Sequence, residues 1–150
     1  MPPPIRRATH PARAAVEAYR RAVELRPDLF EAWNNLGNAC VHLGSYDSAI
    51  EAYEKLRQVD AEDLEALVSL GQLYLGGGQA ALAVAPLTEA ARLRPGQPMI
   101  EALLARALTA SGQQAHAEQV QRRQLAQNPT NLAQRLELAE LLGRQGRHAE

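Results

Sequence analysis

One short stretch of the chain carries side chains suited to binding another molecule. Asn35, Asn38 and His42 follow one another at spacings of three and four residues, and Asn34 precedes them. At the 100° turn per residue of an α-helix, these side chains fall on one polar face. A carboxamide both donates and accepts hydrogen bonds, so such a face can pair with a peptide backbone of any sequence. The alternative interpretation is an ordinary solvated helix face.

Residues that catalyse reactions or bind metals do not occur in a pattern suited to either role. None of the four histidines lies three or four residues from another, so we expect no metal site. Glu62 and Asp63 form an acidic pair at a predicted turn, where solvated capping charges are the ordinary interpretation. The sequence has no phosphate loop, glycine-rich dinucleotide turn or nucleophile elbow. We therefore expect no catalysis and no cofactor.

Composition argues against several other classes of protein. The chain has 150 residues, 46% of them hydrophobic, and 16 Lys+Arg balance 17 Asp+Glu, which predicts one folded domain without a nucleic-acid partner. Cys40 is the single cysteine and is expected to pack as a small hydrophobic residue. Lys55 is the only lysine among the 16 cationic residues, and the others are arginine. This excess of arginine over lysine indicates a GC-rich, bacterial genome. No apolar run suits a secretion signal or a membrane span, so we expect a cytoplasmic protein.

The elements that must position these side chains recur with a period of 34 residues. Positions separated by multiples of this period form a column, and three columns hold one residue type in four successive repeats. They are Gly44, Gly78, Gly112 and Gly146; Leu36, Leu70, Leu104 and Leu138; and Ala15, Ala49, Ala83 and Ala117. Within one period, apolar residues recur at spacings of three and four on both sides of the glycine, which predicts a helical hairpin. The glycine is expected just past the first helix, in a left-handed conformation.

Local signals predict how the hairpins begin, pack and bend. Residues with capping side chains precede three of the predicted helices: Asp28, Asp63 and Asn131. Gly37 and Gly71 recur inside helices, which indicates that paired backbones approach closely there. Pro86 falls within a second helix and is expected to kink or restart it.

Departures from the repeated pattern gather toward the C-terminus. Glu101 and Arg135 stand in the column of Trp33. Three glutamines replace apolar residues of an earlier second helix: Gln121, Gln124 and Gln127. We therefore expect the helix that carries these glutamines to be the loosest.

The repeated residues resemble the signature of tetratricopeptide repeats. They are Pro27, Trp33, Leu36, Gly37, Gly44, Tyr46, Ala49 and Tyr53. The resemblance implies an all-α fold, a right-handed α-solenoid of helical hairpins with three full repeats at 30–63, 64–97 and 98–131. A half repeat at 11–29 and a truncated repeat at 132–150 flank them, so the repeat domain spans 11–150. Residues 1–10 are expected to be a disordered segment.

In tetratricopeptide proteins, the first helices line a groove that holds extended or helical peptide segments. The resemblance therefore implies a partner-binding groove formed by Asn34, Asn35, Asn38, His42, Ser69, Gln72 and Arg106. The chaperone-binding subgroup clamps a C-terminal carboxylate with cations. The matching positions here are Asn34, Glu65, Met99 and Leu103. Because these residues cannot form a cationic clamp, chaperone tails are not the expected partners.

These observations favour a non-catalytic adaptor that binds a protein or peptide partner of unknown identity. An alternative is the substrate-recognition arm of a larger enzyme, because residues 31–39 are similar to repeats that precede O-GlcNAc-transferase-like catalytic domains. Those transferases typically carry an asparagine at the same position of successive repeats. Against this alternative, the column of Asn35 holds Ser69, Leu103 and Glu137 in the following repeats, so the row of asparagines does not continue.

A third interpretation is a self-assembling scaffold. The last predicted helix carries an apolar stripe of Leu136, Leu138, Leu141 and Leu142. A solenoid normally finishes with a polar capping helix, which does not follow this stripe in the sequence. We therefore expect either that the natural chain continues or that open ends pack together in a homo-oligomer.

Overall fold

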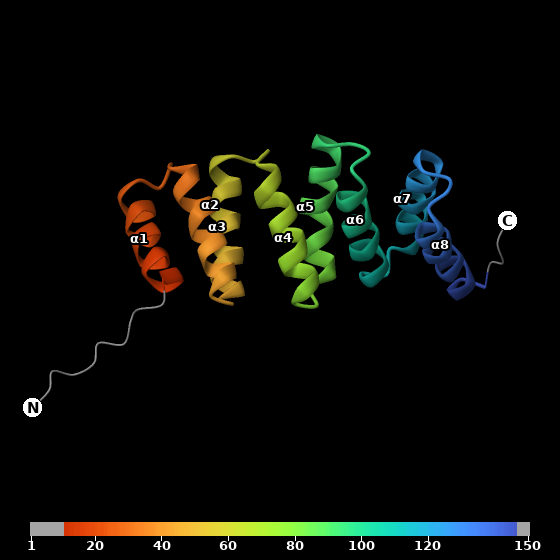
Figure 1. Cartoon of the computed structure of the whole chain (residues 1–150), viewed down its shortest axis with the longest axis horizontal. Coiled ribbons are helices and arrows are strands. Elements are labelled where there is room, and N and C mark those ends of the chain that lie inside the picture. The colour runs from red at the N-terminus through yellow and green to blue at the C-terminus, as the bar shows by residue number, and fades with distance from the viewer. Residues whose placement is uncertain (1–10, 147–150) are drawn as a thin grey trace, which may run out of the picture. The chain divides into compact units, whose positions relative to one another are not determined.

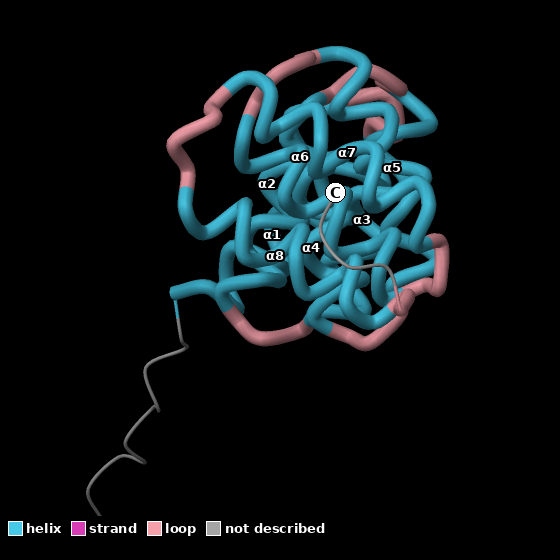
Figure 2. Tube along the Cα trace, turned by 90° about the vertical axis from the view of Figure 1, so that its right-hand side faces the viewer, coloured by secondary structure: helices cyan, strands magenta, loops and turns pink. Residues whose placement is uncertain are grey.

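The computed structural model describes residues 11–146, and every regular element in that range is an α-helix (Figures 1 and 2). The helices are α1 (Pro11–Leu25), α2 (Phe30–His42), α3 (Tyr46–Val59), α4 (Leu64–Gly76), α5 (Ala80–Leu93), α6 (Pro98–Ala110), α7 (Gln114–Gln127) and α8 (Leu132–Arg144). The expected all-α fold is confirmed. The prediction of a disordered segment at 1–10 lies outside the described residues.

The chain divides into two compact units, Met1–Ala66 and Leu67–Glu150. In the first unit, α2 packs against both α1 and α3. In the second unit, α6 packs against α5 and α7, and α7 packs against α8. Each unit therefore buries its helices against their neighbours along the chain.

The recurrent glycine ends the first helix of each hairpin, as expected. Gly44, Gly78, Gly112 and Gly146 have φ angles of 72°, 73°, 81° and 67°, in the left-handed region that favours glycine. Directly after Gly44, the backbone N–H of Ser45 donates to the carbonyl of Cys40 at 2.9 Å. This bond satisfies a carbonyl at the helix end that has no partner within the helix.

Close approach explains the glycines inside the first helices. A Cβ atom at position 37 would lie 2.7 Å from the Tyr53 ring, and one at position 71 would lie 2.4 Å from Leu87. Real Cβ atoms essentially never show contacts this short. The two glycines therefore let α2 meet α3 and α4 meet α5, which confirms the prediction from their spacing.

The predicted caps hold at two of three positions. The Asp63 carboxylate accepts from the Ala66 N–H at 2.7 Å, and the Asn131 side chain accepts from the Gln134 N–H at 3.3 Å. The cap at Asp28 is wrong, because Leu29 is the residue before α2 and makes no side-chain cap bond. Asp28 stands one residue too early in the repeat and lies 4.0 Å from Arg26 instead.

Pro86 does not restart its helix. It is buried inside α5, which runs without interruption from Ala80 to Leu93. Proline cannot donate to the carbonyl four residues earlier, which belongs to Leu82. Leu82 is 53% exposed, so water can replace the missing donor there. The cost of the lost bond is therefore small at this position.

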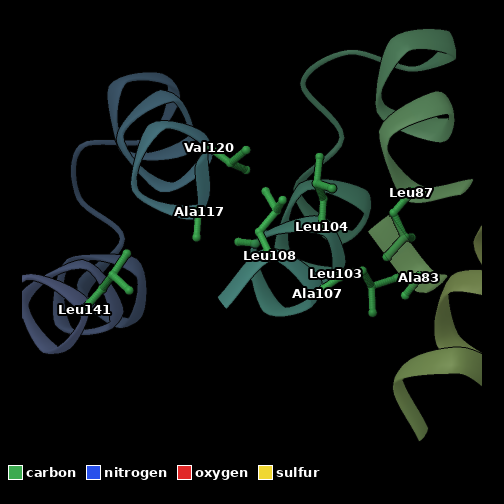
Figure 3. Close-up of a cluster of buried hydrophobic side chains, with 10 residues drawn as sticks. Ala83, Leu87, Leu103, Leu104, Ala107, Leu108, Ala117, Val120 and Leu141 are labelled. Atoms are coloured by element: carbon green, nitrogen blue, oxygen red, sulfur yellow. The ribbon is translucent and has the colours of Figure 1, made fainter. Parts of the chain in front are cut away.

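The core of the second unit brings apolar side chains of four helices together (Figure 3). Ala83 and Leu87 come from α5, whereas α6 contributes Leu104 and Leu108 and α7 contributes Val120. Leu141 of α8 completes the cluster. Because α6 packs against both α5 and α7, it is buried on two sides.

The apolar stripe expected on α8 is only partly exposed. Leu138, Leu141 and Leu142 are buried, which corrects the prediction for these three residues. Leu136 remains 57% exposed, together with Leu132 at 65%. The two sets separate because residues 132 and 136 lie one turn apart on a face that does not meet α7.

The atypical residues of α6 and α7 are built into the second unit. Glu101 is buried, and its carboxylate accepts from the Gly96 N–H at 3.2 Å. Trp33, in the same column, donates from its indole to the Pro27 carbonyl at 2.8 Å. Both side chains thus connect a first helix to the loop before it. The Trp33 side chain donates to a backbone carbonyl, whereas the Glu101 side chain accepts from a backbone N–H. Gln124 is also buried and donates to the Pro98 carbonyl at 3.5 Å.

Candidate functional site

The asparagines of α2 form a hydrogen-bonded cluster within the first unit. The Tyr53 hydroxyl, on a side chain that is 1% exposed, donates to the Asn38 side-chain oxygen at 2.6 Å. The Asn38 amide donates to one carboxylate oxygen of Glu65 at 3.2 Å, and the Asn34 amide donates to the other at 3.4 Å. We call Asn34, Asn38, Tyr53 and Glu65 the asparagine cluster. It links α2 to α3 and to the first turn of α4.

The other predicted groove residues have different surroundings. Asn35 and His42 are exposed on α2, in the first unit. Ser69 on α4 is half-buried, and Gln72 on the same helix is exposed. The seven predicted residues therefore divide between the two units, and only Asn34 and Asn38 share a bonded neighbour, Glu65.

Arg106, the last predicted residue, lines a groove of about 560 Å³ in the second unit. Alanines of α6 leave room for this groove, and α8 forms its opposite wall. We call it the α6–α8 groove. Its polar lining residues are Arg106, Thr109, Gln121, Glu137, Glu140 and Arg144.

Most of the charged side chains in the α6–α8 groove have no partner among residues 11–146. The side chains of Arg106 and Arg144 make no hydrogen bond or ion pair within this range, and neither do those of Glu137 and Glu140. Gln121 is 7% exposed, and its buried side-chain oxygen has no hydrogen-bond partner in the described structure. A buried acceptor without a donor costs about 1–3 kcal/mol. Two cations, two anions and an unsatisfied acceptor are therefore available to a bound molecule.

The sequence analysis missed five of the six polar residues of this groove, although the repeat contained a signal for three of them. Glu137, Glu140 and Arg144 stand in the columns of Asn35, Asn38 and His42, which were predicted to face a partner. Thr109 and Gln121 gave no such signal, because their columns hold Val41 and the buried Tyr53.

Cys40 is buried in the first unit, as expected of a small hydrophobic residue. Its side chain is 1% exposed, and this burial raises the pKa of the thiol. Two nearby charges have smaller effects on the same pKa: Arg20 lowers it and Glu51 raises it. Among the described residues, no group of three or more His, Cys, Asp and Glu side chains is arranged to hold a metal ion. Within the same range, no helix has the length and apolar character required to cross a membrane.

Solved structures with a similar fold are proteins of tetratricopeptide type. YrrB, a TPR protein with an unusual peptide-binding site, has a TM-score of 0.80 and 20% identity over 90% of this chain and 70% of its own. MamA 41-end from Desulfovibrio magneticus RS-1 has a TM-score of 0.76 and 18% identity over 91% and 77%. The first TPR of Spaghetti (RPAP3), bound to HSP90 peptide SRMEEVD, has a TM-score of 0.66 and 20% identity over 78% and 93%.

The comparison with curated proteins finds no significant match. The family profile named Tetratricopeptide repeat matches residues 12–63 and 43–98, which together make up more than half of the chain. The two matches overlap and cover the helices from α1 to α5. The chain belongs to the tetratricopeptide repeat family.

Proposed function

We propose that the chain is a non-catalytic interaction module that holds an extended peptide segment of a partner protein in the α6–α8 groove. The observation that carries this proposal is a set of four charged side chains without an ion-pair partner in the described part of the chain, namely those of Arg106, Glu137, Glu140 and Arg144. A peptide backbone supplies donors and acceptors of hydrogen bonds, and its side chains supply the complementary charges. The peptide complexes of proteins with this fold, such as RPAP3, add support by analogy.

The polar face of α2 is proposed as a separate binding surface of the first unit. Asn35 and His42 are exposed and have no bonded neighbour among the described residues, so both are available to a partner. Ser69 and Gln72 are proposed to act in the same way on α4. Asn34 and Asn38 already donate to Glu65, so a peptide must compete with that carboxylate for their amides.

Selection of peptides from a phage-displayed random library tests the α6–α8 groove. We expect selected peptides to bind the full chain and to lose affinity about tenfold or more when Arg106→Ala and Glu140→Ala are combined. The matched control combines Arg94→Ala and Glu17→Ala, which remove one cation and one anion at exposed positions outside the groove. Equal binding to the groove variant, or an equal loss in the control, contradicts the proposed site.

Asn35→Ala tests the α2 face without disturbing the fold. The side chain is exposed, so we expect weaker peptide retention at an unchanged melting temperature. Asn38→Ala is the less specific variant, because it removes the acceptor of the buried Tyr53 hydroxyl and destabilises the protein as well. If the selected peptides bind the Asn35→Ala variant as well as the original chain, Asn35 is not part of the site.

Self-association is a second candidate function. The observation in its favour is the exposure of Leu132 and Leu136 on α8, at 65% and 57%. Sedimentation analysis over a range of protein concentrations measures it directly. We expect Leu136→Ser to reduce any association, and a chain that stays monomeric at high concentration contradicts this function.

A further inference from the structure

The second helices of the hairpins form a groove in each unit, at equivalent positions of the repeat. In the first unit, a groove of about 280 Å³ is lined by residues of α1, α2 and α3. In the second unit, a groove of about 550 Å³ is lined by residues of α5, α6 and α7. We call them the α1–α3 groove and the α5–α7 groove. Leu36 and Cys40 line the first, and the residues of the same columns, Leu104 and Leu108, line the second.

The floor of the α5–α7 groove is apolar. Leu104, Leu108 and Val120 are 7%, 5% and 9% exposed, and their side chains lie between α6 and α7 (Figure 3). Val84 and Ala91 of α5 are partly buried and pack against the same cluster. The groove therefore opens directly onto the core of the second unit and offers apolar surface to an incoming side chain.

The charge of the two grooves differs at matching positions. Glu24 of the α1–α3 groove is replaced by Arg92 in the α5–α7 groove, and Glu51 is replaced by Gln119. In the described structure, no acidic residue lines the α5–α7 groove. Arg20, the cation that lines the first groove, is matched by the uncharged Thr88 in the second. With Arg123 included and histidine neutral, the lining residues carry a formal charge of −1 in the α1–α3 groove (Arg20, Glu24 and Glu51) and of +2 in the α5–α7 groove (Arg92 and Arg123), above a floor that is apolar in both.

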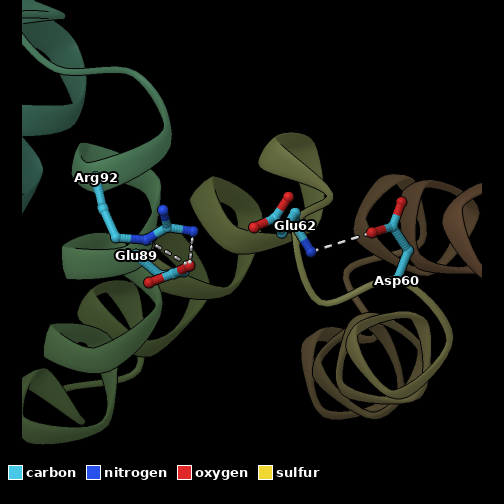
Figure 4. Close-up of polar contacts among 4 residues, drawn as sticks. All are labelled: Asp60, Glu62, Glu89 and Arg92. Carbon is cyan, nitrogen blue, oxygen red and sulfur yellow. Dashed lines mark hydrogen bonds and ion pairs between the residues drawn. The ribbon is translucent and has the colours of Figure 1, made fainter.

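Two arginines and a histidine supply the polar rim of the α5–α7 groove. Arg123 is exposed and makes no ion pair within residues 11–146, whereas Arg92 pairs with Glu89 at 2.6 Å (Figure 4). Glu89 itself does not line the groove. His116, also on the rim, stands in the column of Ser48. The positive charge of Arg123 is therefore fully available to a partner.

We propose that the α5–α7 groove is a second binding surface, which takes an acidic amphipathic segment of a partner protein. Apolar side chains of that segment pack on Leu104, Leu108 and Val120, and its carboxylates face Arg123 and Arg92. The complementary charge selects such a segment, because a basic one would bring like charges together. This surface is separate from the α6–α8 groove and does not depend on the function proposed for that groove.

Two synthetic peptides with fluorescent labels test the chemistry of the partner. Both carry leucine at positions i, i+3, i+4 and i+7 of a helix, but one has glutamate and the other lysine at the remaining positions. We expect fluorescence anisotropy to show that the full chain binds the glutamate peptide at least about tenfold more tightly than the lysine peptide at low salt. Equal affinities, or no binding of the glutamate peptide, overturn the proposal.

Charge variants of the rim test where the glutamate peptide binds. We expect Arg123→Glu to weaken its binding about tenfold, and Thr88→Glu, which places an acid in the wall of the groove, to weaken it as well. Arg94→Glu makes the same change of charge at an exposed position outside the groove and serves as the matched control. Melting temperatures identify any variant that is destabilised.

Backbone amide shifts in NMR spectra then locate the peptide on the protein. Shifts at His116 and Gln119 support the proposal, whereas shifts confined to Glu137 and Glu140 assign the peptide to the α6–α8 groove and overturn it. An equal loss of affinity in Arg94→Glu also overturns it, because the effect is then only one of net charge. If the chain self-associates and Arg123→Glu abolishes that association, the groove belongs to a second copy of the chain and the proposal is wrong.

Discussion

Gly71 provides a test of packing at the scale of a single residue. Gly71→Ala adds a Cβ atom 2.4 Å from the Leu87 side chain, which is completely buried and has little room to move. We expect this strain to lower the free energy of unfolding by about 1–3 kcal/mol, measured by denaturant unfolding.

Gly76, on the same helix, provides the control. No atom lies within 4 Å of the position that its Cβ would take, and its φ angle is not positive. Gly76→Ala should therefore leave stability unchanged or raise it by up to about 1 kcal/mol through helix propensity. Similar losses in the two variants would show that contact with Leu87 is not the reason for Gly71.

Residue columns predict packing better than they predict polar partners. The glycines at positions 37 and 71 were predictable, because a small residue recurring inside a helix has few explanations other than close packing. The bonds of Asn38 to Tyr53 and Glu65 were not predictable, since an amide on a helix face suits solvent as well as a neighbour. The buried side-chain oxygen of Gln121 has no hydrogen-bond partner in the described structure. This was not predictable either, because it depends on side chains of neighbouring helices and not on the residues at the equivalent repeat positions.

At the scale of the element, Asp63 tests the start of α4. Its carboxylate accepts from the Ala66 N–H at 2.7 Å, so Asp63→Ala leaves a donor of the first turn without its partner. We expect the free energy of unfolding to fall by about 1 kcal/mol, measured by chemical denaturation.

Asp28→Ala is the corresponding control at the start of α2. Asp28 makes no cap bond, and its ion pair with Arg26 is long and exposed. At this distance and exposure the pair contributes little or nothing to stability, so we expect Asp28→Ala to cost much less than Asp63→Ala. Equal losses in the two variants would contradict the assignment of the two aspartates.

Helix boundaries were predictable because the period repeats the same start and stop signals. The first helices begin at Phe30, Leu64, Pro98 and Leu132, one period apart. The predictions of a cap at Asp28 and of a helix restart at Pro86 were wrong for a common reason. Each used the general preference of a residue type, whereas the cap depended on a shift of one position and the helix on the exposure of Leu82.

At the scale of the whole molecule, burial predicts which helices open first. In α6, seven residues are buried, whereas α1 buries only Val16 and Val23 among its described side chains. Helices of a repeat protein depend mainly on their direct neighbours, so local opening needs less free energy where little surface is buried. We expect amide hydrogen exchange to be slower in α6 than in α1, measured by mass spectrometry. Equal protection of the two helices would contradict this.

The family and the all-α fold were predictable from the repeat, but the grooves were not. A groove depends on side chains from three or more helices, and its free charges are known only when all possible ion pairs have been examined. Arg106 and Glu140 share a column with Asn38 and Gln72, so the sequence identified a polar face there. It could not show that the charged side chains of this face lack ion-pair partners among the described residues of the second unit, 67–146.

The position of Trp33 has a consequence for spectroscopy. It is the only tryptophan in the chain, it belongs to the first unit, and its indole donates to the Pro27 carbonyl. Its emission therefore reports the loss of structure around α2 alone, whereas far-ultraviolet circular dichroism averages over every helix. Unfolding curves from the two signals coincide only if both units unfold together. The native chain thus carries a built-in reporter for one unit, which needs no introduced label.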